Sequence, residues 1–318
     1  MSTTSSSSVG AASRASFRAR LPTSPRTRFA PAPTGHLHLG HVVNAIHVWG
    51  LARALGGRVL LRIEDHDRQR CRPEYEASIL DDLDWLGLEP DVFPTAAFRV
   101  GRPCAGRQSN REVVYRQAID TVAERGLVYG CRCTRREIEA TAVAGDAELR
   151  YPGTCRPLEL PLVDGLSWRL VVEPGAVRFD DAIHGPTAQD PAAQCGDLLL
   201  RDRLGNWTYQ FAVGVDDTAQ AIDLVVRGDD LFASTGRQIL LARLLGRATP
   251  PVYAHHRLVM KSPTQKLSKS DGDTGVRDLR AAGWTPGRVL GVAAHAARLI
   301  ETPTPLGIAD LPGLMNVR

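Results

Sequence analysis

The chain has 318 residues, of which 43% are hydrophobic and 23% are charged, a composition typical of a folded globular protein. No apolar run approaches the ~18 residues that a membrane span needs, so we expect a cytoplasmic monomer without membrane contact. The net charge of +4 permits a nucleic-acid partner, and six unevenly spaced cysteines argue against a disulfide framework.

The N-terminal segment differs in composition from the rest of the chain. Residues 1–26 are rich in Ser, Ala and Arg and contain no acidic residue, which predicts a disordered extension. An Arg- and Ser-rich start without acidic residues is also similar to an organelle transit peptide. Both interpretations remain open at this point.

The first folded half reads as strand, glycine-rich turn, helix and strand. We predict strands at 27–30 and 58–65 around a helix at 42–55, which together form one βαβ unit. Ligands of such sheets bind at the carboxyl ends of the strands, so the turn at 31–41 and Glu64 should face one crevice. Amphipathic helices are expected at 73–88 and 110–126.

The second half completes an α/β fold. Strands at 167–172 and 176–185 are expected in a small α+β insertion, segment 196–217 is expected to return to the main sheet, and 221–231 reads as another buried strand. We therefore predict a Rossmann-type, doubly wound parallel sheet with a short helical C-terminal region. The expected divisions are 1–26, 27–126, 127–195 (the insertion), 196–260 and 261–318.

The turn PAPTGHLHLGH, residues 31–41, is suited to phosphate. It leads into a helix N-terminus, whose free backbone N–H groups and positive dipole favour anions. Glycines 35 and 40 permit close backbone approach. His38 and His41, three residues apart, can donate hydrogen bonds as negative charge builds on a reacting phosphoryl group. The alternative is a histidine-capped turn without a ligand.

The segment KLSKS, residues 266–270, supplies a second phosphate-handling motif. Lys266 and Lys269 can clamp a triphosphate through its transition state. HLGH followed by KLSKS resembles the signature pair of the class I aminoacyl-tRNA synthetases. Together with RFAPAPTG, LLRIEDHDRQR, QSNR and LVVRGDDL, the resemblance runs from about Thr27 to Ser270 and points to the glutamyl branch. Within that branch it is nearest to compact members that attach glutamate to queuosine in the anticodon of tRNA(Asp).

The resemblance implies substrate roles at matching positions. ATP, which enters with Mg²⁺, would contact His38, Gly40, His41 and Lys269. Arg28 and Arg227 would bind glutamate carboxylates, since guanidinium pairs with carboxylate in a planar, bidentate way. Glu64 would take the ammonium group and Tyr209 would add a hydroxyl. The implied glutamate site is Arg28, Phe29, Ala30, Pro31, Ala32, Glu64, Tyr209 and Arg227.

Two reservations attach to this site. Ala32 stands where the resembled family usually has a small hydroxyl residue, so a substrate hydrogen bond there must come from the backbone or be lost. The alternative to substrate binding is that Arg28 and Glu64 pair with each other across neighbouring strands.

A metal site is implied in the insertion. Cys131 and Cys133, followed by Cys155, are by themselves a weak zinc pattern. The resembled family completes it with a tyrosine, which implies one structural Zn²⁺ held by Cys131, Cys133, Tyr151 and Cys155. The alternative is three free thiols in a surface loop.

The sequence therefore predicts an ATP-dependent ligase that acts on glutamate and the queuosine-containing anticodon arm of tRNA(Asp). Arg132, Arg135 and Arg136 are candidates for phosphate contacts, although solvated helix residues would look the same. The 48 residues after KLSKS are too few for a helical anticodon-binding domain and should form two short helices and a tail. Alternatives are a minimal glutamyl-tRNA synthetase charging a tRNA 3′ end, another HxGH nucleotidyltransferase and an inactive tRNA-binding paralogue.

Overall fold

A parallel βαβ unit carries the histidine-rich turn. The computed structural model describes residues 17–141, 148–262, 265–266, 275–315 and 317. Strands β1 (Arg26–Phe29) and β2 (Arg58–Leu61) pair in parallel and are joined by helix α2 (Leu39–Ala54). Both strands are short apolar runs with buried residues after the first position, as expected for strands covered on two faces.

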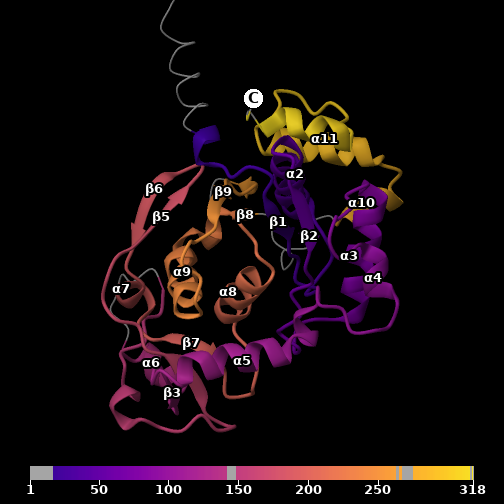
Figure 1. Cartoon of the computed structure of the whole chain (residues 1–318). Helices are drawn as coiled ribbons and strands as arrows, with labels where there is room; N and C mark the ends of the chain where they lie inside the picture. The colour runs from indigo at the N-terminus through magenta and orange to yellow at the C-terminus, as the bar shows by residue number, and fades with distance from the viewer. Residues whose placement is uncertain (1–16, 142–147, 263–264, 267–274, 316, 318) are drawn as a thin grey trace, which may run out of the picture.

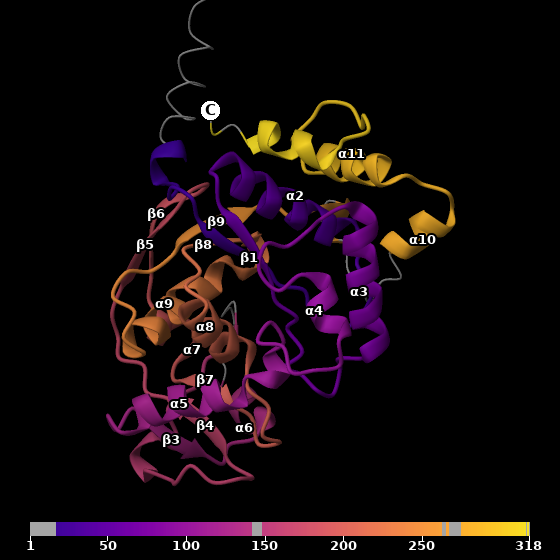
Figure 2. The ribbon, with the colours of Figure 1, turned by 45° about the vertical axis from the view of Figure 1, so that its right-hand side comes forward.

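A second group of strands extends this unit (Figures 1 and 2). Strand β8 (Leu224–Gly228) pairs in parallel with β9 (Val252–His256), which pairs in parallel with β5 (Val177–Asp181). Strand β6 (Gly185–Gln189) adds an antiparallel edge to β5. Strand β1 lies beside β8, because the Asp223 amide donates to the Arg26 carbonyl. The sheet is thus Rossmann-like but mixed, and the expectation of a wholly parallel sheet is corrected.

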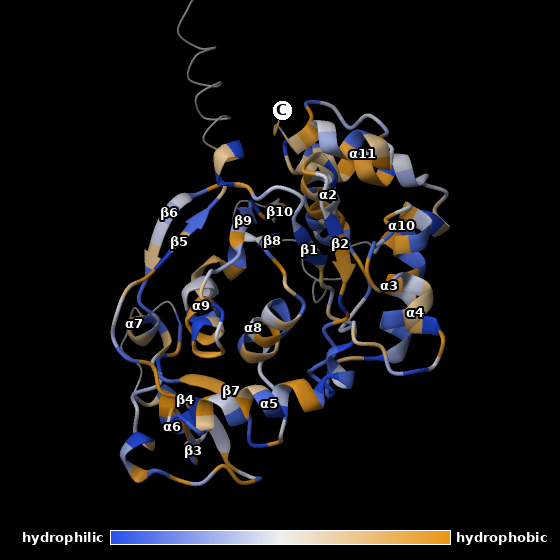
Figure 3. Ribbon diagram, viewed as in Figure 1, coloured by the Kyte–Doolittle hydropathy of each residue, from blue (hydrophilic) through white to orange (hydrophobic). Residues whose placement is uncertain are grey.

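Helix α2 is covered on both sides. One face lies against β1, β2 and β8, and the other packs against α11 (Pro286–Ala296) and the 3-10 helix η5 (Ile308–Met315). Figure 3 shows the apolar character of α2, β2 and α11. A Cβ at Gly50 would lie only 2.8 Å from Met315 Cγ, so the two helices approach closely there. The two C-terminal helices predicted from the sequence are α10 (Val276–Ala281) and α11.

The remaining helices lie beside and below the main sheet. Helix α3 (Pro73–Leu86) contacts α4 (Thr95–Arg99) and α10, and ends at Gly87 in the left-handed conformation. The 3-10 turn η1 (Gln108–Asn110) precedes α5 (Glu112–Ala123). Helix α8 (Tyr209–Ala219) packs on α9 (Thr235–Leu244), which follows the 3-10 helix η3 (Asp229–Ser234). Strands β10 (Met260–Ser262) and β11 (Gln265–Lys266) form a short hairpin.

A separate antiparallel sheet lies at the far end of the molecule from α11 (Figure 1). Its order is β3 (Val128–Cys131), β4 (Ser167–Leu170) and β7 (Leu198–Arg201). Three short elements accompany it: α6 (Arg135–Glu139), η2 (Arg156–Leu158) and α7 (Pro191–Cys195). Helices α5 and α8 connect this sheet to the main one.

Three expectations are corrected by this topology. Strand β7 pairs with β4 and does not return to the main sheet, while β5, expected in the insertion, belongs to the main sheet. Residues 17–20, expected in a disordered extension, form a helical turn, and Leu21 is buried in the core. Strand β2 ends at Leu61, short of the predicted end at residue 65, although the Arg62 and Glu64 amides still donate to the Phe29 and Pro31 carbonyls.

Candidate active site

A cavity of about 610 Å³ opens at the carboxyl ends of β1 and β8, beside the N-terminus of α2. This is the place where ligands bind in open parallel sheets. Ten residues predicted from the sequence line the cavity: Arg28, Ala30, Pro31, Ala32, His38, Gly40, His41, Glu64, Tyr209 and Arg227. The structure therefore brings together residues that lie up to about 200 positions apart in the chain.

The two histidines of HLGH cap the helix through one ring nitrogen each. His38 Nδ1 accepts the Gly40 amide at 3.0 Å, and His41 Nδ1 accepts the His38 amide at 3.1 Å. The neutral rings therefore carry their protons on Nε2. The turn is histidine-capped, as one interpretation holds, but both imidazoles also line the cavity, so capping and ligand binding coexist.

Gly40 lies close to the His38 imidazole. A Cβ there would lie 2.9 Å from His38 Cε1 and 3.1 Å from His38 Nδ1. Such a side chain would push the imidazole from its capping position. The absence of a side chain at position 40 therefore leaves room for the His38 ring in its capping position.

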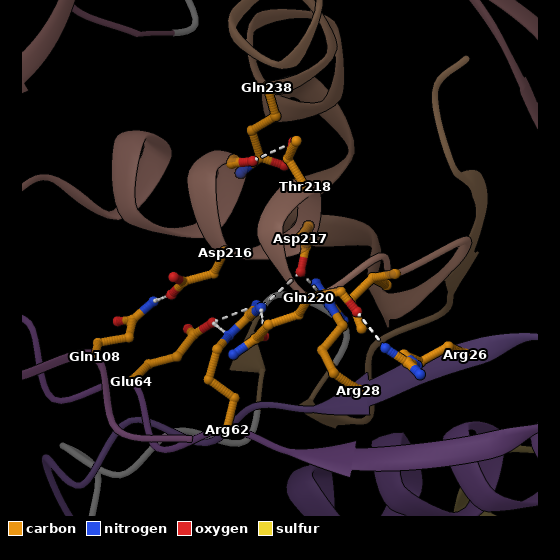
Figure 4. Close-up of polar contacts among 12 residues, drawn as sticks. Arg26, Arg28, Arg62, Glu64, Gln108, Asp216, Asp217, Thr218, Gln220 and Gln238 are labelled. Carbon is orange, nitrogen blue, oxygen red and sulfur yellow. Dashed lines mark hydrogen bonds and ion pairs between the residues drawn. The ribbon is translucent and has the colours of Figure 1, made fainter. Parts of the chain in front are cut away.

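Arg62, a residue that the sequence interpretation missed, holds Glu64. The Arg62 guanidinium is fully buried and donates to Glu64 Oε1 from Nε at 3.3 Å and from Nη2 at 3.0 Å. Its Nη1 donates to Asp217 Oδ1 at 2.7 Å (Figure 4). Among the described residues no partner is found for Glu64 Oε2, so this oxygen is available on the cavity wall. Burial raises the pKa of Glu64, against the opposing effect of Arg62.

Arg28 is anchored by the same aspartate. Its Nε donates to Asp217 Oδ1 at 3.2 Å and its Nη1 to the Val226 carbonyl at 3.2 Å. Burial raises the pKa of Asp217, but the positive charges of Arg28 and Arg62 lower it by more. The net shift of this pKa is therefore downward. The alternative pairing of Arg28 with Glu64 is not found in the described part of the chain, because each residue has a different partner.

Arg227 and Tyr209 complete the polar wall. Arg227 donates to His255, Gln238, Thr235 and the Leu231 carbonyl. The Tyr209 hydroxyl has no hydrogen-bond partner within the part of the chain that the structure describes, although the residue lines the cavity. A phenol in this position can still bond to a ligand.

The QSNR segment, residues 108–111, is not part of the cavity lining and binds the buried carboxylate of Asp216. The Gln108 amide nitrogen donates to Asp216 Oδ2 at 2.8 Å, and Arg111 and Tyr115 donate to the same buried carboxylate. These bonds tie η1 and α5 to α8. His66, which does line the cavity, contacts Gln108 Oε1 through Nδ1 at 2.6 Å.

Three residues of the predicted site are not among the described residues that line the cavity. The Phe29 side chain is 1% exposed and packs on Trp49 in the core, so a contact of Phe29 with glutamate would have to come from its backbone and stays a prediction. Successive side chains of β1 alternate, and Arg28 takes the opposite face. Lys266 belongs to β11, where only the backbone is described, and Lys269 lies outside the described residues.

A compact cysteine cluster lies on the far sheet. The sulfur atoms of Cys131, Cys133 and Cys155 all lie within 4.8 Å of one another. The Tyr151 hydroxyl lies 3.3 Å from Cys131 Sγ and 3.8 Å from Cys133 Sγ, and Cys133 Sγ lies 3.5 Å from Cys155 Sγ. Tetrahedral Zn²⁺ with bonds of about 2.0–2.3 Å places its ligand atoms about 3.3–3.8 Å apart. The four residues therefore fit such an ion.

Comparisons with known proteins agree with this geometry. Residues 25–294 match the family of class I tRNA synthetases (E and Q), catalytic domain. The chain is 39% identical over 302 residues to the glutamyl-Q tRNA(Asp) synthetase of Nitratidesulfovibrio vulgaris, with 92% of each chain covered. It is 45% identical over 250 residues to that of Bordetella bronchiseptica, covering 77% of this chain and 75% of the relative.

Larger synthetases match over part of their length. Glutamate–tRNA ligase 2 of Syntrophus aciditrophicus is 38% identical over 282 residues, which are 86% of this chain and 57% of the relative. The solved glutamate tRNA ligase of Elizabethkingia meningosepticum, in complex with its amino acid, superposes with a TM-score of 0.72 at 25% identity, covering 91% of this chain and 64% of that one. Within the described ranges, no helix is both long and apolar enough to cross a membrane.

Proposed function

We propose, on the premise that this chain belongs to the catalytic-domain family of class I tRNA synthetases (E and Q), that it activates glutamate with ATP and transfers it to the queuosine base of tRNA(Asp). Family membership makes it an ATP-dependent ligase. The finer assignment, to glutamate and to queuosine, is our proposal.

One observation carries the choice of glutamate. The cavity presents two anchored guanidinium groups, Arg28 and Arg227, together with Glu64 Oε2, for which the described residues supply no hydrogen-bond partner. Glutamate has two carboxylates and one ammonium, which is the complement of this set. Glutamine would leave a buried cation without its partner, and such a mismatch costs a few kcal/mol.

Adenylate formation is assigned to the α2 end of the cavity. The Nε2 protons of His38 and His41 would meet the triphosphate, on which negative charge builds as pyrophosphate leaves. Mg²⁺ would accompany ATP and neutralise its phosphates. Lys266 and Lys269 are proposed to act on the same phosphates, as their motif implies.

Transfer to queuosine is supported by the relatives and by the chemistry of the acceptor. Two relatives matched over three quarters or more of their length are named glutamyl-Q tRNA(Asp) synthetase. Queuosine carries a cyclopentene ring with two adjacent hydroxyls, which imitates the vicinal diol of a terminal ribose. Splayed loop bases and phosphates would then be held beside the site, with exposed Arg132, Arg135 and Arg136 as candidate contacts.

A structural Zn²⁺ is proposed for the cysteine cluster. Cys131, Cys133, Cys155 and the Tyr151 phenol offer four ligand atoms at the separations of a tetrahedral site. The ion would hold the loop after β3 against the segment around Tyr151. It would have no part in the chemistry of glutamate activation, because the cluster and the cavity lie on different sheets.

Two assays test the proposed function. ATP–pyrophosphate exchange without tRNA should be supported by glutamate and not by glutamine. Equal exchange with both, or with neither, would overturn the choice of substrate. Labelled glutamate should then transfer to queuosine-containing tRNA(Asp), survive removal of the 3′ CCA end, and fail when guanosine replaces queuosine. Charging of tRNA(Glu) that needs an intact 3′ adenosine would favour the alternative of a minimal glutamyl-tRNA synthetase.

A further inference from the structure

Arg227 is held by the protein at almost every donor it has. Its Nε donates to His255 Nε2 at 2.9 Å and its Nη1 to Gln238 Oε1 at 2.7 Å. Its Nη2 donates to Thr235 Oγ1 at 2.9 Å and to the Leu231 carbonyl at 3.3 Å. A guanidinium has five N–H donors, so within the described part of the chain one N–H, on Nη1, is left for a ligand. The contribution of Arg227 to substrate affinity therefore depends on the orientation of this single N–H donor.

His255 is an unusual partner for a cation, and its setting explains the pairing. Arginine can only donate, so His255 Nε2 must carry a lone pair and the proton must be on Nδ1. His255 Nδ1 lies 2.6 Å from Asp181 Oδ2. Asp181 is itself fixed, because its Oδ1 accepts the amides of Ile183 at 2.9 Å and His184 at 2.8 Å. Both His255 and Asp181 are fully buried.

We propose that His255, held in one tautomer by Asp181, is a positioning residue for Arg227 and thereby for glutamate binding. This inference rests on the proposed function, because it takes Arg227 as a substrate contact. The hydrogen-bonded chain Asp181–His255–Arg227 crosses three neighbouring strands, β5, β9 and β8. The position of Arg227 on the cavity wall is therefore fixed by contacts that begin on β5. It also gives β5 a role in the site.

The surroundings of His255 favour the neutral ring. The charged and titratable groups that face it are Asp181 from β5, Arg227 from β8, Asp229 from η3 and Tyr253 on its own strand. Burial lowers the pKa of His255 below its ordinary value of 6.5, and Arg227 acts in the same direction, whereas the two aspartates oppose it. A protonated ring would set one N–H against another and release Arg227, so glutamate binding should weaken in acid.

Substitution of His255 tests the inference in the exchange assay. His255→Leu removes the acceptor, and we expect the KM for glutamate to rise about tenfold or more with a smaller change in kcat. His255→Gln restores an acceptor oxygen near the Nε2 position and should return KM to within about threefold of wild type. His295→Gln, on an exposed residue of α11, is the matched control. A wild-type KM in His255→Leu would overturn the inference, and so would a Gln variant as poor as Leu.

A second measurement separates this inference from the proposed function. In protein labelled with ¹⁵N at histidine, the imidazole signal that is lost in His255→Gln should show the Nδ1–H tautomer and a pKa below 6.5. The His47 and His256 rings, whose Nδ1 atoms face carbonyl oxygens, should show the same tautomer and remain in the variant. An Nε2–H tautomer or an ordinary titration would overturn the positioning role, whatever the activity. A wild-type enzyme with this tautomer but no exchange with glutamate would overturn the proposed function instead.

Discussion

At the scale of single residues, the charge of the cavity wall is set by a few buried groups. Three guanidiniums (Arg28, Arg62 and Arg227) face two carboxylates (Glu64 and Asp217), which leaves one net positive charge. Glutamate at neutral pH carries one net negative charge. Since a buried charge without a partner costs several kcal/mol, this balance favours a substrate with a second carboxylate.

Glu64→Gln tests the ammonium contact. The amide oxygen can still accept from Arg62, but an amide N–H₂ would replace the unpartnered Oε2 and face the ammonium of the substrate. We expect kcat/KM for glutamate to fall roughly 100-fold, about 2.7 kcal/mol of lost charge-assisted bonding. Because burial raises the pKa of Glu64, wild-type activity should decline in acid at a pH above the ordinary 4.5, and the variant should lack that decline. Unchanged kcat/KM in exchange would remove Glu64 from the substrate site.

At the scale of elements, the contact between α3 and α10 contains a buried carboxyl group. Asp82 on α3 is 2% exposed, and its Oδ2 finds no hydrogen-bond partner among the residues that the structure describes. Burial raises its pKa to about 7, although Arg280 of α10 acts in the opposite direction. The unfolded chain has a pKa near 3.8 for this group, so the folded state binds a proton more tightly between these values. Asp82 therefore destabilises the fold above pH 7, and this penalty fades as the pH falls towards 4.

Asp82→Asn should accordingly stabilise the protein in alkali. We expect its free energy of unfolding at pH 8 to exceed that of wild type by about 1–2 kcal/mol, a discounted share of the full pKa shift. The two proteins should converge near pH 4–5. Denaturant unfolding at several pH values measures both. Asp120→Asn, on an exposed residue of α5, is the control, and an equal gain at all pH values in Asp82→Asn would show that burial of charge is not the cause.

The helices and strands themselves were predicted from the sequence better than the pairing of the strands into sheets. The βαβ unit was evident because its apolar strands, its glycine turn and its helix are consecutive and differ in period. The sheet of β5 and that of β7 were assigned the wrong way round, since an apolar run indicates a strand but does not identify its neighbour. Leu21 was missed because one apolar residue in a polar segment shows no periodicity.

The same limit applies to the site. Arg28, Glu64, His38 and His41 lie in recognisable motifs beside strand ends, so their convergence could be predicted. Arg62 lies in the motif LLRIEDHDRQR and Asp217 lies in none, and nothing in the sequence says that this buried aspartate bridges Arg62 and Arg28. His255 could have been suspected only from its place at the end of an apolar strand.

At the scale of the whole molecule, the proposed activities occupy two separate sheets. The cavity lies at the edge of β1 and β8, while the cysteine cluster lies on the sheet of β3, β4 and β7. Helices α5 and α8 join them through the buried Asp216 network. A change in the cluster should therefore affect how the far sheet holds nucleic acid before it affects glutamate activation.

Cys155→Ser tests this separation. Serine removes one of three thiolate ligands, so we expect protein purified without a polyhistidine tag to lose its stoichiometric zinc in metal analysis. ATP–pyrophosphate exchange with glutamate should stay within about threefold of wild type, whereas transfer to tRNA(Asp) should fall tenfold or more because the far sheet loosens. Cys195→Ser, a buried thiol outside the cluster, should keep zinc and both activities. Full zinc content in Cys155→Ser would point to another ligand set, and a parallel loss of exchange would show that the two sheets act as one unit.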